Sequence, residues 1–282
     1  MADVNADQRA YWNSASGAKW VRYDQQLEVM QREVTETLMA RSGISAGSRV
    51  LDLGCGTGAT TREAARMAGA GGRVTGVDIS EPLLAHARSV QAGGEAAPIS
   101  YLCADAQVDD LGSACFDRVI SRLGSMFFED PVAACANIRA AVAPGGTMAL
   151  ICWRRGEDNP WFSLPRQVAV SHLGDEPTNP DAPGALAFGD EVRVCDMLTR
   201  AGWEVRCDPV ALHLTPEGSP EDVARLATRL GPAVRLISVY QADAAQIAAI
   251  EADIADVFRG YETGGEVRIP AVMNLFSATG PA

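Results

Sequence analysis

Short apolar runs alternate with amphipathic segments along most of the chain. The runs that predict buried strands lie at residues 49–53, 73–78, 99–104, 117–121 and 147–153. The segments with helical spacing of apolar positions between them lie at residues 59–69, 81–91 and 131–142. Short strands that alternate with helices predict a parallel sheet covered by helices on both faces.

Two further segments have helical spacing but stand outside this alternation. Residues 18–41 predict one amphipathic helix that ends near Gly43, and residues 219–262 predict helical structure that begins at Ser219 and Pro220. Each apolar face must be buried against something. The open carboxyl edge of the sheet is the available surface, so we expect both segments to act as lids there.

The rest of the chain completes a single domain over residues 1–282. Prolines in residues 154–189 predict a loop-rich insertion around a short helix. A helix at 190–201 and strands at 203–214 and 267–278 follow. We therefore expect the following parts: an N-terminal helical cap at 1–43, a ligand-binding core at 46–153, and lid insertions at 154–189 and 219–262.

The first predicted strand runs directly into a glycine-rich turn. Residues 50–61 read VLDLGCGTGATT, and Asp78 ends the second predicted strand. Glycines let a turn pass close to a ligand, and the following helix offers unpaired N–H groups to an anion. A carboxylate at the next strand end can accept the hydroxyls of a ribose. A dinucleotide needs G-x-G-x-x-G, whereas this turn reads G-x-G-x-G, so the pattern favours S-adenosylmethionine over NAD.

The chain resembles the Rossmann-like S-adenosylmethionine-dependent methyltransferases, in particular the small-molecule group that includes the ubiquinone/menaquinone C-methyltransferases. The resemblance covers residues 46–153 and the final strand. It rests on the glycine turn followed, in the family's order, by VTGVDIS (74–80), YLCADAQ (101–107), FDRVISRLGSMFF (116–128) and VAPGGTMALICW (142–153). The resemblance implies an α/β Rossmann-like doubly wound sheet, mostly parallel with an antiparallel last strand, with helical lid additions.

The resemblance also implies which residues bind the cofactor, because open α/β sheets bind ligands at the carboxyl ends of their strands. The implied residues are Gly54, Gly56, Thr57, Asp78, Ile79, Asp105, Ala106 and Ser121. Trp20 of the predicted N-terminal helix is a further candidate, independent of the resemblance.

The resemblance assigns these implied residues to different parts of the cofactor. Gly54, Gly56 and Thr57 would contact the methionyl part, Asp78 the ribose, and Ile79 the adenine. Asp105 would accept the adenine amino group, the Ala106 N–H would donate to the ring, and the Ser121 carbonyl would accept the ammonium. Trp20 would close over the donor. The alternatives are a helix cap for Asp78, a local turn for Asp105 and plain packing for Trp20.

The sequence assigns no catalytic residue. Methyl transfer is an in-line displacement that alignment and exclusion of water can accelerate, so a base is required only for a protonated, poor nucleophile. Among the three histidines, His172 in the proline-containing insertion is a weak candidate for that base. Arg122 and Arg154, each just past a predicted strand, are candidates for orienting an anionic or aromatic acceptor. The alternative is that both are ordinary surface arginines.

Charge and cysteine usage exclude several classes of partner. The net charge is −12 and the pI is about 4.7, so the surface repels phosphate backbones and anionic membranes. We therefore expect no nucleic acid and no membrane partner. The seven cysteines show no metal-ligand spacing and read as reduced core residues. We expect no metal and a cytoplasmic location, and the sequence gives no oligomeric state.

The sequence thus predicts an S-adenosylmethionine-dependent methyltransferase that acts on a small molecule. The main alternative is an S-adenosylmethionine-binding module, or a non-methylating enzyme, on the same fold. A more distant alternative is an NAD-dependent oxidoreductase.

Overall fold

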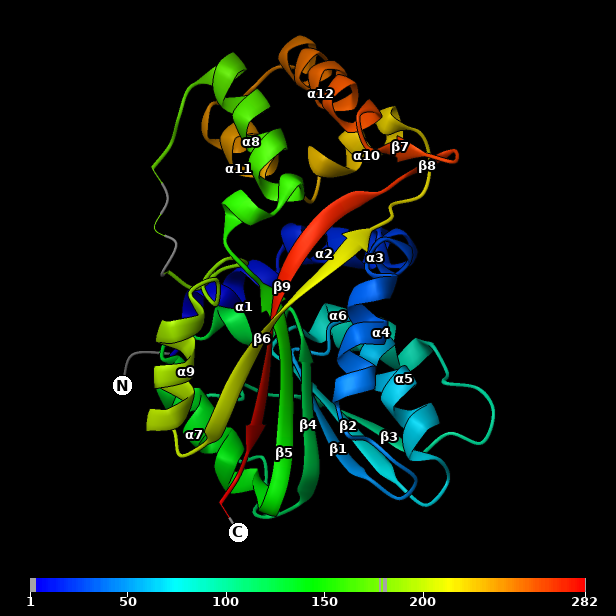
Figure 1. The fold of residues 1–282 in the computed structure, drawn as a ribbon, viewed down its shortest axis with the longest axis vertical. Coiled ribbons are helices and arrows are strands. Elements are labelled where there is room, and N and C mark those ends of the chain that lie inside the picture. The colour runs from blue at the N-terminus through cyan, green and yellow to red at the C-terminus, as the bar shows by residue number, and fades with distance from the viewer. Residues whose placement is uncertain (1–3, 178, 180–181, 282) are drawn as a thin grey trace.

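A seven-stranded sheet forms the core of this protein, whose structure is a computed structural model that describes residues 4–177, 179 and 182–281 (Figure 1). The strand order is β3-β2-β1-β4-β5-β9-β6. Strands β1 to β5 pair in parallel, and β9 runs antiparallel between β5 and β6. This arrangement confirms the predicted doubly wound sheet with an antiparallel last strand. The bounds are β1 (Arg49–Leu53), β2 (Arg73–Asp78), β3 (Ile99–Cys103), β4 (Phe116–Arg122), β5 (Val142–Trp153), β6 (Glu204–Leu214) and β9 (Ile269–Thr279).

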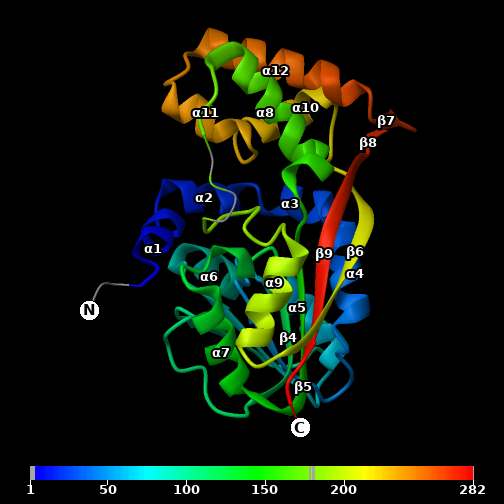
Figure 2. The ribbon, with the colours of Figure 1, turned by 60° about the vertical axis from the view of Figure 1, so that its left-hand side comes forward.

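Helices cover both faces of the sheet, as the alternating pattern predicts. Helices α7 (Pro131–Ala141) and α9 (Glu191–Arg200) lie together on one face, and α4 (Arg32–Arg41) and α5 (Ala59–Ala68) lie on the other (Figures 1 and 2). Asp130 and Asp190 fix the starts of α7 and α9, because each carboxylate accepts two backbone N–H groups of the first turn. Helix α6 (Glu81–Ser89) follows β2 and begins at Ser80, which caps it.

A group of helices stands beyond the carboxyl edge of the sheet, at the top of Figure 1. This helical cap consists of α8 (Pro160–Leu173), α10 (Pro220–Ala227), α11 (Ala233–Val239) and α12 (Ala244–Arg259). It has an apolar interior of its own, where Trp161 of α8 stacks on Phe258 of α12 with ring centroids 6.1 Å apart. The long strands β6 and β9 lead from the sheet to the cap, and β7 (Glu262–Thr263) and β8 (Glu266–Val267) form a small hairpin beside it.

The N-terminal segment differs from the single helix predicted at 18–41. It forms α1 (Ala6–Trp12), α2 (Ala15–Arg22), α3 (Asp24–Met30) and then α4, with breaks at Tyr23 and Gln31. Tertiary structure explains the second break, because the carbonyl of Met30 accepts the N–H of Thr215 at 3.1 Å. The bends allow α2 and α3 to lie along the edge of the sheet while α4 packs beside it (Figure 1).

The insertion at 154–189 contains more helix than predicted. After the short 3₁₀ turn η2 (Gly156–Asp158), α8 runs for 14 residues. Another 3₁₀ turn, η1 (Ser125–Phe127), lies earlier in the chain, between β4 and α7. Pro160 occupies the first helical turn, where no N–H is needed, and Pro165 is tolerated inside the helix. The predicted loop is confined to the residues after α8, of which 178, 180 and 181 lie outside the described residues. In the described part of the chain, no helix has the length and apolar content to cross a membrane.

Candidate cofactor and acceptor site

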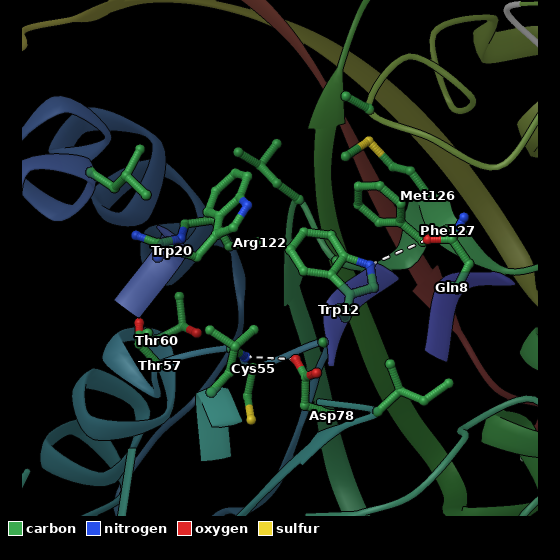
Figure 3. Close-up of a pocket in the computed structure, with 18 of the residues that line it drawn as sticks. Gln8, Trp12, Trp20, Cys55, Thr57, Thr60, Asp78, Arg122, Met126 and Phe127 are labelled. Carbon is green, nitrogen blue, oxygen red and sulfur yellow. Dashed lines mark hydrogen bonds between the residues drawn. The ribbon is translucent and has the colours of Figure 1, made fainter. Parts of the chain in front are cut away.

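A cavity of about 260 Å³ lies between the carboxyl edge of the sheet and the helical cap (Figure 3). Its first part, the glycine-turn end, is lined by Gly54, Cys55, Gly56, Thr57, Thr60, Asp78, Ile79, Ala104, Asp105 and Ala106. Its second part, the cap end, is lined by Trp153, Trp161, Phe162, Ala185, Leu230 and Gly231. Side chains from α1, α2 and α3 also line the cavity, namely Gln8, Trp12, Trp20, Asp24, Leu27, Glu28 and Met30.

The glycines of the turn serve two different purposes. Gly54 has φ +60°, and a Cβ there would stand 2.8 Å from the Cα of Gly124, so this glycine permits two backbone turns to cross. Gly56 has φ +53°, and a Cβ there would meet no atom within 4 Å. The turn is therefore packed tightly beneath Gly54 and open at Gly56, which leaves room for a ligand against the backbone.

Asp78 is held in place by backbone donors. Its Oδ2 accepts the N–H of Gly56 at 2.8 Å, and its Oδ1 accepts the N–H of Ser80 at 2.9 Å. Burial raises the pKa of this carboxyl, and the hydrogen bonds from Ser80 and Gly56 oppose that rise. A carboxylate has about four acceptor positions, so Asp78 can still accept the hydroxyls of a ribose.

Asp52 lies behind the turn, next to the last residue of β1, and is completely buried. Its Oδ2 accepts the hydroxyls of Thr60 at 2.7 Å and Thr61 at 2.6 Å, which ties β1 to the first turn of α5. Burial raises the pKa of Asp52 to about 6, although these hydrogen bonds and the charge of Arg122 lower it. Among the residues that the structure describes, none is a hydrogen-bond partner of Asp52 Oδ1.

Asp105 is engaged by the N-terminal segment. The Nδ2 of Asn5 donates to Oδ1 at 3.0 Å and to Oδ2 at 2.9 Å, and the N–H of Gln107 donates to Oδ1 at 2.9 Å. Asn5 is itself fixed by Glu129, whose carboxylate accepts the Asn5 N–H at 3.0 Å. Both the implied adenine contact and the alternative turn use the same carboxylate, and Oδ2 retains acceptor capacity for a ligand.

Arg122 is the last residue of β4, lines the cavity and pairs with Glu28 of α3. Its Nη1 donates to Glu28 Oε2 at 2.9 Å and its Nη2 to Oε1 at 2.5 Å, while Nη1 also donates to the hydroxyl of Thr35 at 2.7 Å. Burial alone would lower the pKa of Arg122, but the charges of Glu28 and Asp52 raise it above its ordinary value. This is a planar, two-point ion pair inside the cavity wall.

The cap end is largely apolar and aromatic. Trp153, at the end of β5, packs edge to face against Phe162 of α8 with centroids 4.8 Å apart. Trp161 is buried, and Leu230 and Gly231 follow α10. Such a lining suits the apolar body of a small molecule, with few polar groups to orient it.

The structure brings most of the predicted cofactor residues together. Those that line the cavity are Gly54, Gly56, Thr57, Asp78, Ile79, Asp105, Ala106 and Trp20. Ser121 does not line it; this buried residue donates its hydroxyl to the carbonyl of Leu53 at 2.8 Å.

The three catalytic candidates are scattered. Arg122 lines the cavity, whereas His172 and Arg154 are absent from its lining. His172 pairs with Asp253 of α12 at 2.6 Å, and Arg154 approaches Asp158 and Glu191 at 3.7 and 3.5 Å.

Sequence reasoning missed several lining residues. Asn5, Gln8 and Glu28 come from helical turns before the glycine motif, where nothing in the local pattern indicates a ligand. Trp161 stands in the insertion at 154–189, where the sequence predicts a loop around a short helix, and it lies in the first turn of α8. A signal was available nonetheless, because this insertion follows β5, which ends at the carboxyl edge of the sheet.

The residues fit the predicted cofactor. The open space at Gly56 can receive an amino-acid chain, and Asp78 and Asp105 present acceptors in order along neighbouring strand ends. A metal site is not indicated, since the described residues contain no group of three or more His, Cys, Asp or Glu side chains placed to hold an ion.

Comparison with known proteins agrees with this geometry. A family model described as a methyltransferase domain matches residues 50–146. A malonyl-[acyl-carrier protein] O-methyltransferase from Erwinia pyrifoliae is 30% identical over 170 residues, which are 59% of this chain and 62% of that protein. The chain spans 51 to 64% of the length of the first curated relatives it matches.

Solved structures share the fold at low identity. A phosphoethanolamine N-methyltransferase 2 from Haemonchus contortus superposes with a TM-score of 0.59 and 17% identity, covering 100% of this chain and 61% of that one. The [4+2]-cyclase SpnF superposes with a TM-score of 0.50 and 20% identity, covering 89% of this chain and 81% of that one. Residues 50–146 therefore match a methyltransferase domain, and the solved structures share the Rossmann-like fold of this chain.

Proposed function

We propose that this protein transfers a methyl group from S-adenosylmethionine to a small molecule bound at the cap end of the cavity. One observation carries the proposal: the glycine turn with Asp78 and the aromatic residues of the helical cap line the same cavity. A donor at the glycine-turn end would therefore point its reactive centre toward an acceptor at the cap end.

The glycine-turn end would hold the cofactor through the predicted residues. Gly54, Gly56 and Thr57 would contact the methionyl part, Asp78 the ribose hydroxyls and Asp105 the adenine amino group. The cofactor, when bound, supplies an electrophilic methyl group on a sulfonium. The four carboxylates of Asp24, Glu28, Asp78 and Asp105 around the cavity favour a cationic ligand over an anionic one.

The cap end supports an apolar, ring-containing acceptor. Trp153, Trp161 and Phe162 offer aromatic faces, which agrees with the resemblance to ubiquinone/menaquinone C-methyltransferases. Alignment and exclusion of water are what this lining can contribute to the reaction. Among the described lining residues there is no histidine, so a proton released by the acceptor would pass to a carboxylate such as Glu28, or to water.

The negative charge of the chain bears on its partners and its location. With a net charge of −12, we propose no nucleic acid and no membrane partner, and a cytoplasmic location. We also propose that residues 1–282 act as one domain, since the cavity takes residues from the N-terminal helices, the sheet and the helical cap.

Two measurements test the function. Calorimetry should show binding of S-adenosylmethionine and its demethylated product, but not of NAD. Incubation with S-adenosylmethionine and a panel of apolar phenols, amines and carbon acids should then release S-adenosylhomocysteine in the presence of at least one acceptor. Tight donor binding with no turnover across the panel would favour the alternative, a binding module or a non-methylating enzyme. Preference for NAD would overturn the proposal.

A further inference from the structure

We propose that Arg122 binds the carboxylate at the amino-acid end of the donor, and that Glu28 occupies this arginine until the donor arrives. The inference rests on the proposed function, since it assigns a residue within the same cofactor site. It also changes the role that the sequence suggests for Arg122, which is to orient the acceptor.

The charges around the cavity favour binding of a ligand carboxylate beside Arg122. S-adenosylmethionine carries an ammonium and a carboxylate on the same carbon atom. Four acidic side chains line the cavity, and among the described lining residues Arg122 is the only one with a permanent positive charge. Among the side chains of this negative environment, that guanidinium is the one that stabilises a ligand carboxylate by its charge.

The position of Arg122 matches the amino-acid end of the donor rather than the adenosine end. The charge of Arg122 acts on Asp52, and Asp52 is hydrogen-bonded to Thr60 at the start of α5. In Figure 3, Arg122 and Trp20 lie on the side of the cavity that carries Thr57 and Thr60. The ribose and adenine contacts, Asp78 and Asp105, belong to β2 and to the residues after β3.

Glu28 presents to Arg122 the same chemical group that the donor would present. Its carboxylate makes a two-point pair with the guanidinium at 2.9 and 2.5 Å. The side chain of Glu28 is 25% exposed, whereas that of Arg122 is 12% exposed and is also held by Thr35. Glu28 can therefore rotate away while Arg122 stays in place. An exchange of one carboxylate for another never leaves the buried guanidinium unpaired, which is the costly state.

The exchange has a consequence for the lid. Glu28 lies on α3, between the breaks at Tyr23 and Gln31. When Glu28 leaves Arg122, the ion pair that joins this short helix to β4 is therefore lost. Donor binding at the glycine-turn end would thus be coupled to α3, which also lines the cavity through Asp24 and Leu27.

A pair of ligands separates this role from the others. S-adenosylhomocysteine and 5′-methylthioadenosine share the adenosine and the thioether, but the second lacks the amino-acid carbons and hence the carboxylate. Calorimetry with both ligands is carried out on the wild type, Arg122→Gln, Glu28→Gln and, as a matched control at the other end of the same strand, Arg118→Gln. Arg118 bonds to the carbonyl of Gly43 and does not line the cavity.

The expected pattern is specific to the carboxylate. Arg122→Gln lowers the affinity for S-adenosylhomocysteine roughly ten- to a hundredfold, the range for a lost charge-assisted hydrogen bond, and changes that for 5′-methylthioadenosine less than about twofold. Glu28→Gln removes the competing charge and raises the affinity for S-adenosylhomocysteine only. Arg118→Gln changes neither. Because Glu28→Gln predicts a gain, the proposal stays testable even if Arg122→Gln fails to fold.

Other patterns overturn the inference. Equal losses for both ligands in Arg122→Gln would make Arg122 an anchor of α3 and α4. If Arg122→Gln left both affinities unchanged, Arg122 would not bind the donor, and its role would be to orient the acceptor or to pack against its neighbours. An unchanged affinity of Glu28→Gln for S-adenosylhomocysteine would lead to the same conclusion. Failure of the wild type to bind either ligand is a different result, because it would remove the proposed function itself.

Discussion

The two ends of the cavity are built by opposite means. The glycine-turn end is made of backbone turns and carboxylates at the ends of adjacent parallel strands, all within residues 54–106. The cap end is made of large apolar side chains from β5, α8 and the residues after α10, which lie far apart in sequence. The glycine-turn end is defined by backbone turns, and the cap end is defined by the packing of helices.

This difference has a physical origin. A cofactor with a fixed shape is recognised by hydrogen bonds that must stand in fixed positions, and crossing backbone segments such as Gly54 and Gly124 supply that rigidity. An acceptor pocket needs chiefly shape and apolar area, which many combinations of side chains provide. The predictions below test whether the two ends are as independent as their construction indicates.

The largest effect is expected at the glycine turn. Gly54→Ala places a Cβ 2.8 Å from the backbone of Gly124 at a positive φ, so overpacking and strain should together lower the free energy of unfolding by about 2 to 5 kcal/mol. Gly56→Ala is the matched control, since its Cβ meets nothing and only backbone strain of about 1 to 2 kcal/mol remains. Urea denaturation measures both. Equal losses would mean that the crossing of the two turns is not tight.

Asp78→Ala should weaken binding rather than folding. Loss of the carboxylate leaves the N–H groups of Gly56 and Ser80 without their acceptor and removes the ribose contact. We expect the affinity for S-adenosylhomocysteine to fall by about 1 to 3 kcal/mol in calorimetry, with a cooperative unfolding transition retained. Glu81→Ala, on the exposed start of the next helix, is the control. An unchanged dissociation constant in folded Asp78→Ala would remove this residue from the site.

Asp52 predicts a pH dependence of stability. Burial raises its pKa from 3.8 to about 6, so the folded state favours the protonated form, and stability is lost as the pH rises toward and through 6. Asp52→Asn lacks this titration. The unfolding free energy of the variant minus that of the wild type should therefore increase by about 2 kcal/mol between pH 4 and pH 7. A constant difference would show that Asp52 has the same pKa in both states.

The sequence signals of the glycine-turn end are local, and the structure places the residues concerned along one cavity. Their binding of the cofactor stays a prediction. The strand, the glycines and Asp78 stand in a short stretch, and the conformation that Gly54 and Gly56 require is a property of those residues themselves. The parallel sheet followed from the alternation of elements for the same reason. Asn5 was not predictable, since it reaches Asp105 from a segment that precedes the motif by many residues.

For the helices outside the alternation, the sequence predicted the position along the chain but not the breaks or the full length. The break at Gln31 depends on a hydrogen bond from Thr215 to Met30, and no periodicity within residues 18–41 records that partner. Likewise, Pro165 reads as a helix breaker, although packing in the helical cap retains it inside α8. Tertiary contacts decided both cases, and they also decided which aromatic side chains face the cavity.

The smallest effect on cofactor affinity should come from a variant at the cap end. A small effect is what independence of the two ends predicts. Phe162 of α8 is half-buried against Trp153, so Phe162→Ala should cost about 1 to 2 kcal/mol of unfolding free energy. If the two ends are independent, the same variant should bind S-adenosylhomocysteine within about twofold of the wild type, or about 0.4 kcal/mol. Calorimetry on the folded variant gives this directly. A loss as large as that of Asp78→Ala would mean that the cap closes on the cofactor itself, because only contact with the cofactor or closure coupled to it can transmit the change. In that case the acceptor would have to enter before closure, or bind in what remains of the cavity.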